Sequence, residues 1–362
     1  MGYHRKSIFL SDIVPIIMLY RLFCHSILLI ALAGVACCCS QRPDPKGART
    51  VIDGFTQGGT YHIVLKGTGY DSGALKHEID SLFSIVDRSM SLYNPESLLS
   101  RLNRNETDSV DSFITRCIEQ AEQISRESNG AYDITIKPLT AAYGFAGDST
   151  TGAPNIDSLL QLVGYEKIAI RDGRLIKQNS NMQLDLNSLA QGATVDFVAS
   201  WLDGKGIENY IIEMGGEIFC RGTNPNNTLW HIGIDRPIEG NLTPGADLQV
   251  IIGVSGQGLA TSGNYRKYYT TDDGRKIVHT IDARTGEPVI SNLLSATVVA
   301  STATLADAYG TLFMILGLDR SKEFLSTRPD LQAYLIYSDD AGELKTYVTP
   351  GLASMIVPQP KH

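Results

Sequence analysis

Two kinds of hydrophobic pattern are mixed along residues 51–356, and this mixture most constrains the fold. Apolar residues at helical spacing predict helices at residues 75–86, 113–124, 195–202 and 305–316. Short apolar runs bounded by turn residues predict strands at residues 60–65, 210–214, 278–281, 296–300, 331–337 and 344–348, with a hairpin turn at Asp273-Gly274. Helices and strands do not alternate regularly, so we expect an α+β domain rather than a βαβ fold.

Composition excludes several classes of protein. The chain has 362 residues, of which 43% are hydrophobic, and a formal net charge of -8. Such a charge provides no basic footprint for nucleic acid, which we do not expect as a partner. Beyond the N-terminus no apolar run approaches the roughly 18 residues that would predict a membrane span. We therefore expect one large globular domain at residues 51–356, although its length also allows two.

The N-terminus has the pattern of an export signal. A short apolar core, Ile27 to Ala36, follows basic residues and ends in small ones directly before Cys37. This is similar to a bacterial lipoprotein signal, in which that cysteine becomes the lipidated first residue; Cys38 is the alternative. We predict a signal peptide at residues 1–36 and a polar tether at 37–50, and hence a protein anchored by lipid to the extracytoplasmic side of a bacterial membrane. An uncleaved anchor is the competing interpretation.

Only two cysteines, Cys117 and Cys220, lie in the body of the chain. In an exported protein they could form a disulfide, but sequence does not show whether the side chains meet. Burial as two small apolar residues is the favoured interpretation.

Two segments have residues suited to binding a phosphorylated ligand. Asp307 and Thr311 lie four residues apart in a predicted helix, so their oxygens share one face and suit Mg²⁺. The segment from Leu184 to Gly192 leads from an apolar strand into a helix, whose free N–H groups would favour an anion such as phosphate. Taken alone, each is more commonly a solvated pair or an ordinary turn.

A third segment contains a candidate proton acceptor. His279 is expected at the end of a strand, and Asp282 follows three residues later, so the pair could be a general base and its orienting carboxylate. A structural histidine is equally compatible with the pattern. The histidines and body cysteines do not have zinc-ligand spacing.

In this order, and with further motifs, the chain resembles the FAD:protein FMN transferase family, the ApbE-type flavin transferases. The resemblance runs from about Thr56 to Pro350. The motifs that carry it are Gly59-Thr60-Tyr61, Met90 to Tyr93, Asn129 to Thr135, Leu184 to Asp196, Met214 to Glu217, Ala260 to Tyr265, His279 to Gly286 and Asp307 to Thr311. It implies a single ApbE-like (T-fold-like) domain.

The resemblance also implies roles for particular residues. It implies a magnesium ion held by Ser188, Asp307 and Thr311, and a general base at His279. It implies FAD contacts from Gly58, Tyr93, Ala131, Tyr132, Asp133, Asp185, Gln191 and Ile281. Three positions depart from the family pattern, because Gln191 stands where Lys or Glu is common, Gly58 where Met is common, and Ala283 where Pro is usual.

The reaction implied by the resemblance is Mg²⁺-dependent transfer of FMN from FAD to a protein. A Thr or Ser hydroxyl of an exported or membrane electron-transfer flavoprotein would attack the FMN phosphorus, and AMP would leave. Two alternatives stay open from the sequence. One is an FAD pyrophosphatase in which water attacks, and the other is a flavin-binding lipoprotein without catalysis.

Overall fold

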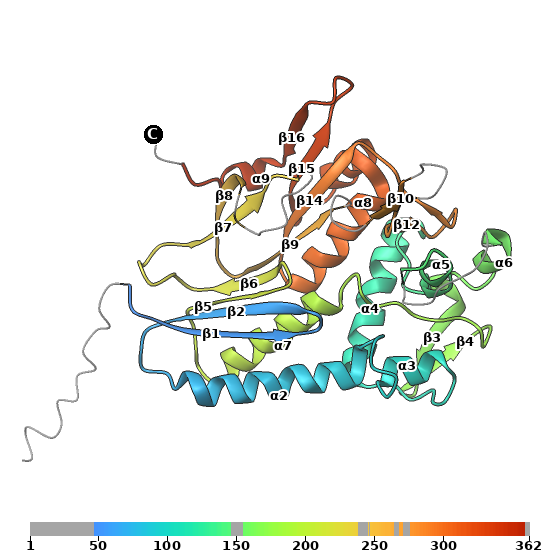
Figure 1. Cartoon of the computed structure of the whole chain (residues 1–362), viewed down its shortest axis with the longest axis horizontal. Coiled ribbons are helices and arrows are strands. Elements are labelled where there is room, and N and C mark those ends of the chain that lie inside the picture. Colours follow the sequence, from blue (N-terminus) through green and yellow to red (C-terminus); the bar gives the residue numbers. More distant parts are fainter. Residues whose placement is uncertain are drawn as a thin grey trace, which may run out of the picture. The chain divides into compact units, whose positions relative to one another are not determined.

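The computed structural model describes residues 47–145, 155–237, 245, 247–263, 268–270 and 276–358. Its centre is an eight-stranded antiparallel sheet in the order β1-β2-β5-β6-β9-β14-β15-β16 (Figure 1). The strands are β1 (Arg49–Thr56), β2 (Gly59–Lys66), β5 (Tyr210–Met214), β6 (Glu217–Arg221), β9 (Gln257–Gly263), β14 (Leu293–Ala300), β15 (Gln332–Ser338) and β16 (Leu344–Val348).

Helices and four two-stranded sheets surround this central sheet. The helices are α2 (Ser72–Met90), α3 (Leu98–Asn103), α4 (Ser112–Glu127), α5 (Lys137–Ala142), α6 (Ile156–Leu160), α7 (Ala190–Gly204), α8 (Ala303–Ser326) and α9 (Pro350–Ala353), with a 3-10 turn, η2 (Tyr165–Lys167). The small sheets pair β3 (Ile168–Arg171) with β4 (Arg174–Lys177), β7 (Trp230–Asp235) with β8 (Leu248–Val254), β10 (Tyr268–Thr270) with β11 (Lys276–Val278), and β12 (Ile281–Asp282) with β13 (Glu287–Pro288).

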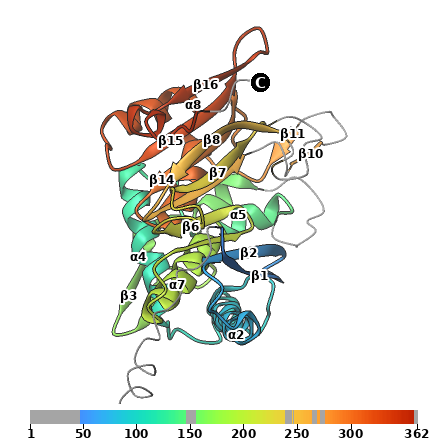
Figure 2. The same ribbon diagram turned by 90° about the vertical axis from the view of Figure 1, so that its left-hand side faces the viewer.

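The two faces of the central sheet are covered by different elements. Alternation along β2 places Ile63 in the core shared with α2 and α7, and Val64 in the core beneath β7 and β8. At the other end of the sheet, α8 packs against β9 and β14 and is joined there by α4. In both ribbon views α2 lies below β1 and β2, and the β15–β16 hairpin is at the far end (Figures 1 and 2). The N-terminal ends of α7 and α8 thus meet inside the domain.

The long helices begin where local sequence allows them to begin. Asp111 accepts hydrogen bonds from the amides of Phe113 and Ile114 at 3.0 and 2.9 Å, and so caps α4. The predicted apolar stripe of α2 is buried from Leu75 to Val86. The spacing of apolar residues was therefore sufficient to predict α2 and α4.

The α+β fold is confirmed, with three local differences. β1 begins at Arg49, inside the expected tether at residues 37–50. The predicted strand at residues 278–281 is wrong as one element, because β11 ends at Val278 and the chain turns before Ile281 pairs with Pro288 in β12–β13. The helix expected at residues 305–316 continues to Ser326 past a break at Gly317, whose φ is 73°.

The two body cysteines are free and buried, which confirms the favoured interpretation over a disulfide. In the described part of the chain, no helix is both long and apolar enough to span a membrane. The expected signal peptide, its cleavage site and Cys37 lie outside the described residues, as does the hairpin turn at Asp273-Gly274.

Candidate functional site

The site begins at the junction that leads into α7. Asp185 accepts a hydrogen bond from the amide of Asn187 at 2.9 Å, which turns the chain after the buried Leu184. Its other oxygen accepts a bond from the hydroxyl of Thr140 in α5 at 3.3 Å. No side chain caps the start of α7. The expected helix start is therefore present, and no side chain of its own segment caps it. The expected strand before it is not, because Gln183 makes only an isolated bridge to Ile136 and Leu184 lies in no strand.

The amide of Gly192, in the first turn of α7, donates to Oδ2 of Asp307 at 3.2 Å. Asp307 is only 6% exposed, and in the described part of the chain it has no ion-pair partner. Burial raises the pKa of this carboxyl to about 7, the Gly192 amide lowers it, and the charge of Asp196 raises it further. A buried carboxylate held by one amide, with a second carboxylate near it, is an environment that a cation would stabilise.

Thr311 follows Asp307 on the next turn of α8, where it is half-buried. Its hydroxyl makes no hydrogen bond to any described residue, so it is available as an oxygen ligand. The position between them, Gly310, is packed closely against β9, since an added Cβ would lie 2.8 Å from Oγ of Ser262. The spacing thus gives the expected pair of oxygens on one helix face.

Ser188 is connected to this region through Tyr132. The two hydroxyls are 2.8 Å apart, and the Tyr132 ring is almost fully buried. Burial raises the pKa of the Tyr132 phenol well above its ordinary value, although the hydrogen bond with Ser188 lowers it. Tyr132 therefore holds the Ser188 hydroxyl in position.

The neighbours of Tyr132 connect three segments. Asp133 uses both carboxylate oxygens within the fold, accepting from the Thr135 amide at 2.8 Å and the Tyr165 amide at 2.6 Å. Burial raises the pKa of Asp133 despite these bonds. The carbonyl of Ala131 accepts from the amide of Ala283 at 3.2 Å, which joins the segment to β12 and the buried Ile281. Ala131 and Asp133 therefore shape the site through the backbone.

The structure gives Asp282 a different partner from the one that sequence suggested. Both of its oxygens bind Arg284, at 2.9 and 2.6 Å, rather than being reserved to orient His279. His279 itself lies between β11 and β12, half-buried, with its ring edge-on to Phe145 at 6.3 Å between centroids. Ile281, two residues further along the chain, packs in an apolar cluster with Leu139 and Ala283.

Two predicted FAD-binding residues, Tyr93 and Gly58, are exposed on loops, and a third, Gln191, lies in the first turn of α7. Tyr93 is 76% exposed on the loop after α2. Gly58 occupies the exposed β1–β2 turn with a φ of 78°. The amide of Gln191 lies against Gly215, whose added Cβ would be 2.7 Å from Nε2 of Gln191. Gln57, beside Gly58, donates to Thr194 of α7 at 3.0 Å, so the β1–β2 turn lies over the start of α7.

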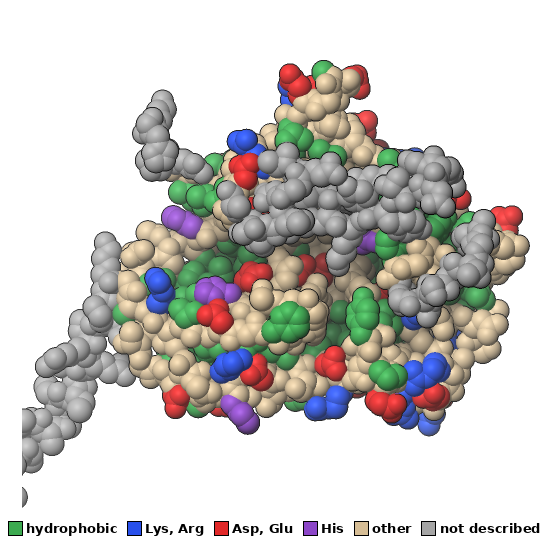
Figure 3. All heavy atoms as spheres, viewed as in Figure 1, with side chains coloured by type: hydrophobic (Ala, Val, Ile, Leu, Met, Phe, Trp, Pro, Cys, Tyr) green, Lys and Arg blue, Asp and Glu red, His purple; other side chains and the backbone are tan. Residues whose placement is uncertain are grey.

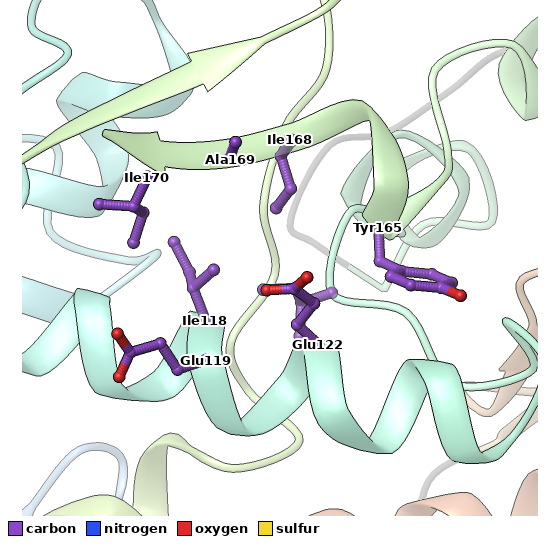
Figure 4. A pocket seen from close by; sticks show the side chains of 8 residues that line it. Ile118, Glu119, Glu122, Tyr165, Ile168, Ala169 and Ile170 are labelled. Carbon is purple, nitrogen blue, oxygen red and sulfur yellow. The ribbon is translucent and has the colours of Figure 1, made fainter.

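The region where α7 and α8 meet is distinct from a second pocket in the surface, between α4 and β3. On the face in Figure 3 the surface is hollowed over the region where α7 and α8 meet in the ribbon view, and hydrophobic and acidic side chains are visible in the hollow. A different pocket, of about 150 Å³, lies between α4 and β3 and contains Glu119, Glu122 and Tyr165 (Figure 4). It includes none of the predicted site residues.

Sequence reasoning missed the partners that hold the site together. It did not find Thr140 beneath Asp185, or the role of Asp196, whose carboxylate binds the start of α8. The spacing of Gly192 and Asp196 puts both on one face of α7, which was readable. That α8 lies against this face was not.

The α+β fold therefore places the buried carboxylate of Asp307 at the start of α7, which no side chain of its own segment caps. The ApbE family model matches residues 57–335, and the chain belongs to the ApbE family. This confirms the resemblance found in the motifs.

Named relatives and solved structures agree with this assignment. The FAD:protein FMN transferase of Escherichia coli K12 is 29% identical over 335 residues, covering 88% of this chain and 93% of the relative. That of Vibrio cholerae is 32% identical over 298 residues, covering 80% and 88%. The fold is similar to the flavin transferase ApbE from Vibrio cholerae, with a TM-score of 0.75 and 30% identity over 85% of this chain and 99% of that one. It is also similar to the apo flavinyl transferase ApbE of Pseudomonas stutzeri, with a TM-score of 0.74 and 28% identity over 85% and 96%.

Proposed function

We propose that this protein is a Mg²⁺-dependent FAD:protein FMN transferase. The observation that carries the proposal is the buried Asp307 carboxylate, which faces the uncapped start of α7 and receives only the Gly192 amide. Relatives that carry the name FAD:protein FMN transferase match most of the chain, which supports FAD as the substrate.

The residues present fit a magnesium ion. Asp307, Thr311 and Ser188 would supply hard oxygen ligands, and water and phosphate oxygens would complete the shell. A magnesium ion bound there would neutralise the charge that builds on the pyrophosphate during transfer. Tyr132 orients Ser188 through the 2.8 Å contact between their hydroxyls. Ala131, Asp133 and Asp185 would hold the loops around FAD, while Gly58, Gln191, Ile281 and Tyr93 would contact it at the rim of the site.

The chemistry required of the chain is then positioning and one proton transfer. The acceptor's Thr or Ser oxygen forms a bond to the FMN phosphorus, and the bond from that phosphorus to the AMP oxygen breaks. A ring nitrogen of His279 takes the proton of the attacking hydroxyl. AMP leaves, and the product is a flavoprotein linked through a phosphoester.

The test is incubation of the full-length protein with FAD, Mg²⁺ and an exported electron-transfer flavoprotein as acceptor. We expect a flavin-fluorescent acceptor band on a denaturing gel, with AMP released in equal amount, and neither in EDTA. Free FMN with AMP and no fluorescent band would instead establish an FAD pyrophosphatase. FAD that is bound but unchanged would establish a non-catalytic flavin-binding protein. Either result overturns the proposed transfer.

We also propose that the protein is exported and anchored by lipid at Cys37 on the extracytoplasmic side of a bacterial membrane. Support comes from the apolar segment Ile27 to Ala36 and the cysteine that follows it. Mass spectrometry of the N-terminal peptide is expected to find a lipidated Cys37. Cys37→Ser should release the protein from the membrane fraction, with Cys38→Ser as its matched control. Lipid on Cys38, or membrane retention of Cys37→Ser, would contradict this assignment.

A further inference from the structure

Asp196 makes an unusual set of contacts between two helices. From α7 it reaches the start of α8, where its oxygens accept from the amides of Ala303 and Thr304, each at 2.9 Å, and from the Thr304 hydroxyl. These amides are among the first N–H groups of α8, which have no partner within their own helix. A side chain from another helix therefore satisfies the start of α8.

This contact is one of two between the same pair of helices. Gly192, one turn before Asp196 on α7, donates its amide to Asp307, one turn after Ala303 on α8. The two helices therefore contact each other through two pairs, Gly192–Asp307 and Asp196–Ala303, whose members on each helix are four residues, about 6 Å, apart along the axis. Asp196 of α7 accepts from two backbone amides of α8, and Asp307 of α8 accepts from the backbone amide of Gly192 in α7.

Close backbone packing also restricts the first turn of α8, in addition to these hydrogen bonds. An added Cβ on Gly192 would lie 2.5 Å from the carbonyl oxygen of Ala303. An added Cβ on Gly258 of β9 would lie 2.2 Å from the Ala303 amide nitrogen. The backbone of α8 is thus packed directly against α7 on one side and β9 on another, and Asp196 holds it there.

We infer that Asp196 is a positioning residue for the cation site: it fixes the first turn of α8 so that Asp307 and Thr311 present their oxygens at the start of α7. Asp196 is not itself a ligand, because its oxygens bind the backbone and hydroxyl of α8. The inference rests on the proposed function for the identity of the ion. Asp196 would therefore affect the affinity of the site for Mg²⁺ rather than the rate of the chemical step.

The test compares Asp196→Asn with the wild type in the full-length protein. Asn retains one acceptor oxygen but places an NH₂ group against an amide of α8, so the first turn should loosen. We expect the Mg²⁺ concentration for half-maximal FAD consumption to rise about tenfold or more. Turnover should approach the wild-type rate once Mg²⁺ is saturating. Amide hydrogen exchange, measured without metal, should become faster in the peptide that begins at Ala303.

Two further variants keep the test decisive. Thr304→Val removes one bond to Asp196 and conserves side-chain volume, so it should shift the Mg²⁺ requirement in the same direction by a smaller factor, even if Asp196→Asn folds poorly. Asp111→Ala is the control for general stability, because it removes the side chain that caps α4 through two backbone amides, and α4 carries none of the proposed ligands. It should lower stability and leave the Mg²⁺ requirement unchanged.

The outcomes distinguish this inference from the proposed function. A wild-type protein that consumes FAD with Mg²⁺, together with an unchanged Mg²⁺ requirement in Asp196→Asn or Thr304→Val, overturns the role of Asp196 alone. An equal shift in Asp111→Ala also overturns it, because the effect would then follow general stability. A wild-type protein that consumes no FAD with Mg²⁺ overturns both.

Discussion

Asp307 is a carboxylate that the fold buries with a single amide for a partner. Asp307→Asn keeps the volume and can still accept the Gly192 amide, but it removes the negative charge on which cation binding depends. We expect FAD consumption to fall by roughly 100-fold or more, measured as AMP release, because an essential metal ligand is lost. Stability in urea should be equal or higher, because a buried uncompensated charge has been removed. Wild-type turnover in this variant would exclude Asp307 as a ligand.

The Tyr132 hydroxyl makes a bond whose loss should be visible in activity. Tyr132→Phe leaves the ring in its buried place and releases the Ser188 hydroxyl. We expect kcat/KM for FAD to fall about tenfold and the free energy of unfolding to fall by about 1 kcal/mol.

Tyr210→Phe is the control for this change. Tyr210 is also buried, and its hydroxyl donates to Asp203 at 2.8 Å, away from the proposed ligands. It should lose similar stability and keep its kcat/KM. Equal activity in the two variants would show that the bond to Ser188 is only structural.

At the scale of elements, α8 is placed by close backbone packing as well as by its apolar face. Gly258→Ala would put a Cβ into the backbone of α8 at Ala303. We expect the free energy of unfolding to fall by about 2–3 kcal/mol, as in other overpacked cores. Urea denaturation measures this directly.

Gly204→Ala provides the contrast, since Gly204 ends α7 and an added Cβ there would meet nothing within 4 Å. It should leave stability unchanged or raise it by up to about 1 kcal/mol, because alanine favours the helix. If Gly258→Ala behaved in the same way, the tight contact between β9 and α8 would not be required for folding.

Elements also show why some predictions succeeded. The stripes of α2 and α4 were visible because each helix buries one face and exposes the other. By contrast, α8 buries residues around most of its circumference, so its length and its break at Gly317 were not evident. β9 was missed because glycine and polar residues interrupt its short apolar run.

At the scale of the whole molecule, Cys117 and Cys220 report on global packing. Burial raises the pKa of both thiols to about 12, so almost no thiolate is present at pH 8. We expect iodoacetamide to leave both unlabelled in the native protein and to label both in concentrated urea. Peptide mass spectrometry would resolve each site separately from the N-terminal cysteines. Rapid labelling of either cysteine under native conditions would contradict its burial.

The sequence by itself determined the fold class, the long helices, five of the eight strands of the central sheet, and the family, because these depend on local periodicity and on motifs in a fixed order. It also determined that Asp307 and Thr311 share a helix face. Only the tertiary structure decided that Gly192 meets Asp307 and that Tyr132 holds Ser188. The reason is physical: these residues lie 115 and 56 positions apart in the chain, so their hydrogen bonds depend on how the helices and loops pack, and spacing along the chain has no information about that packing.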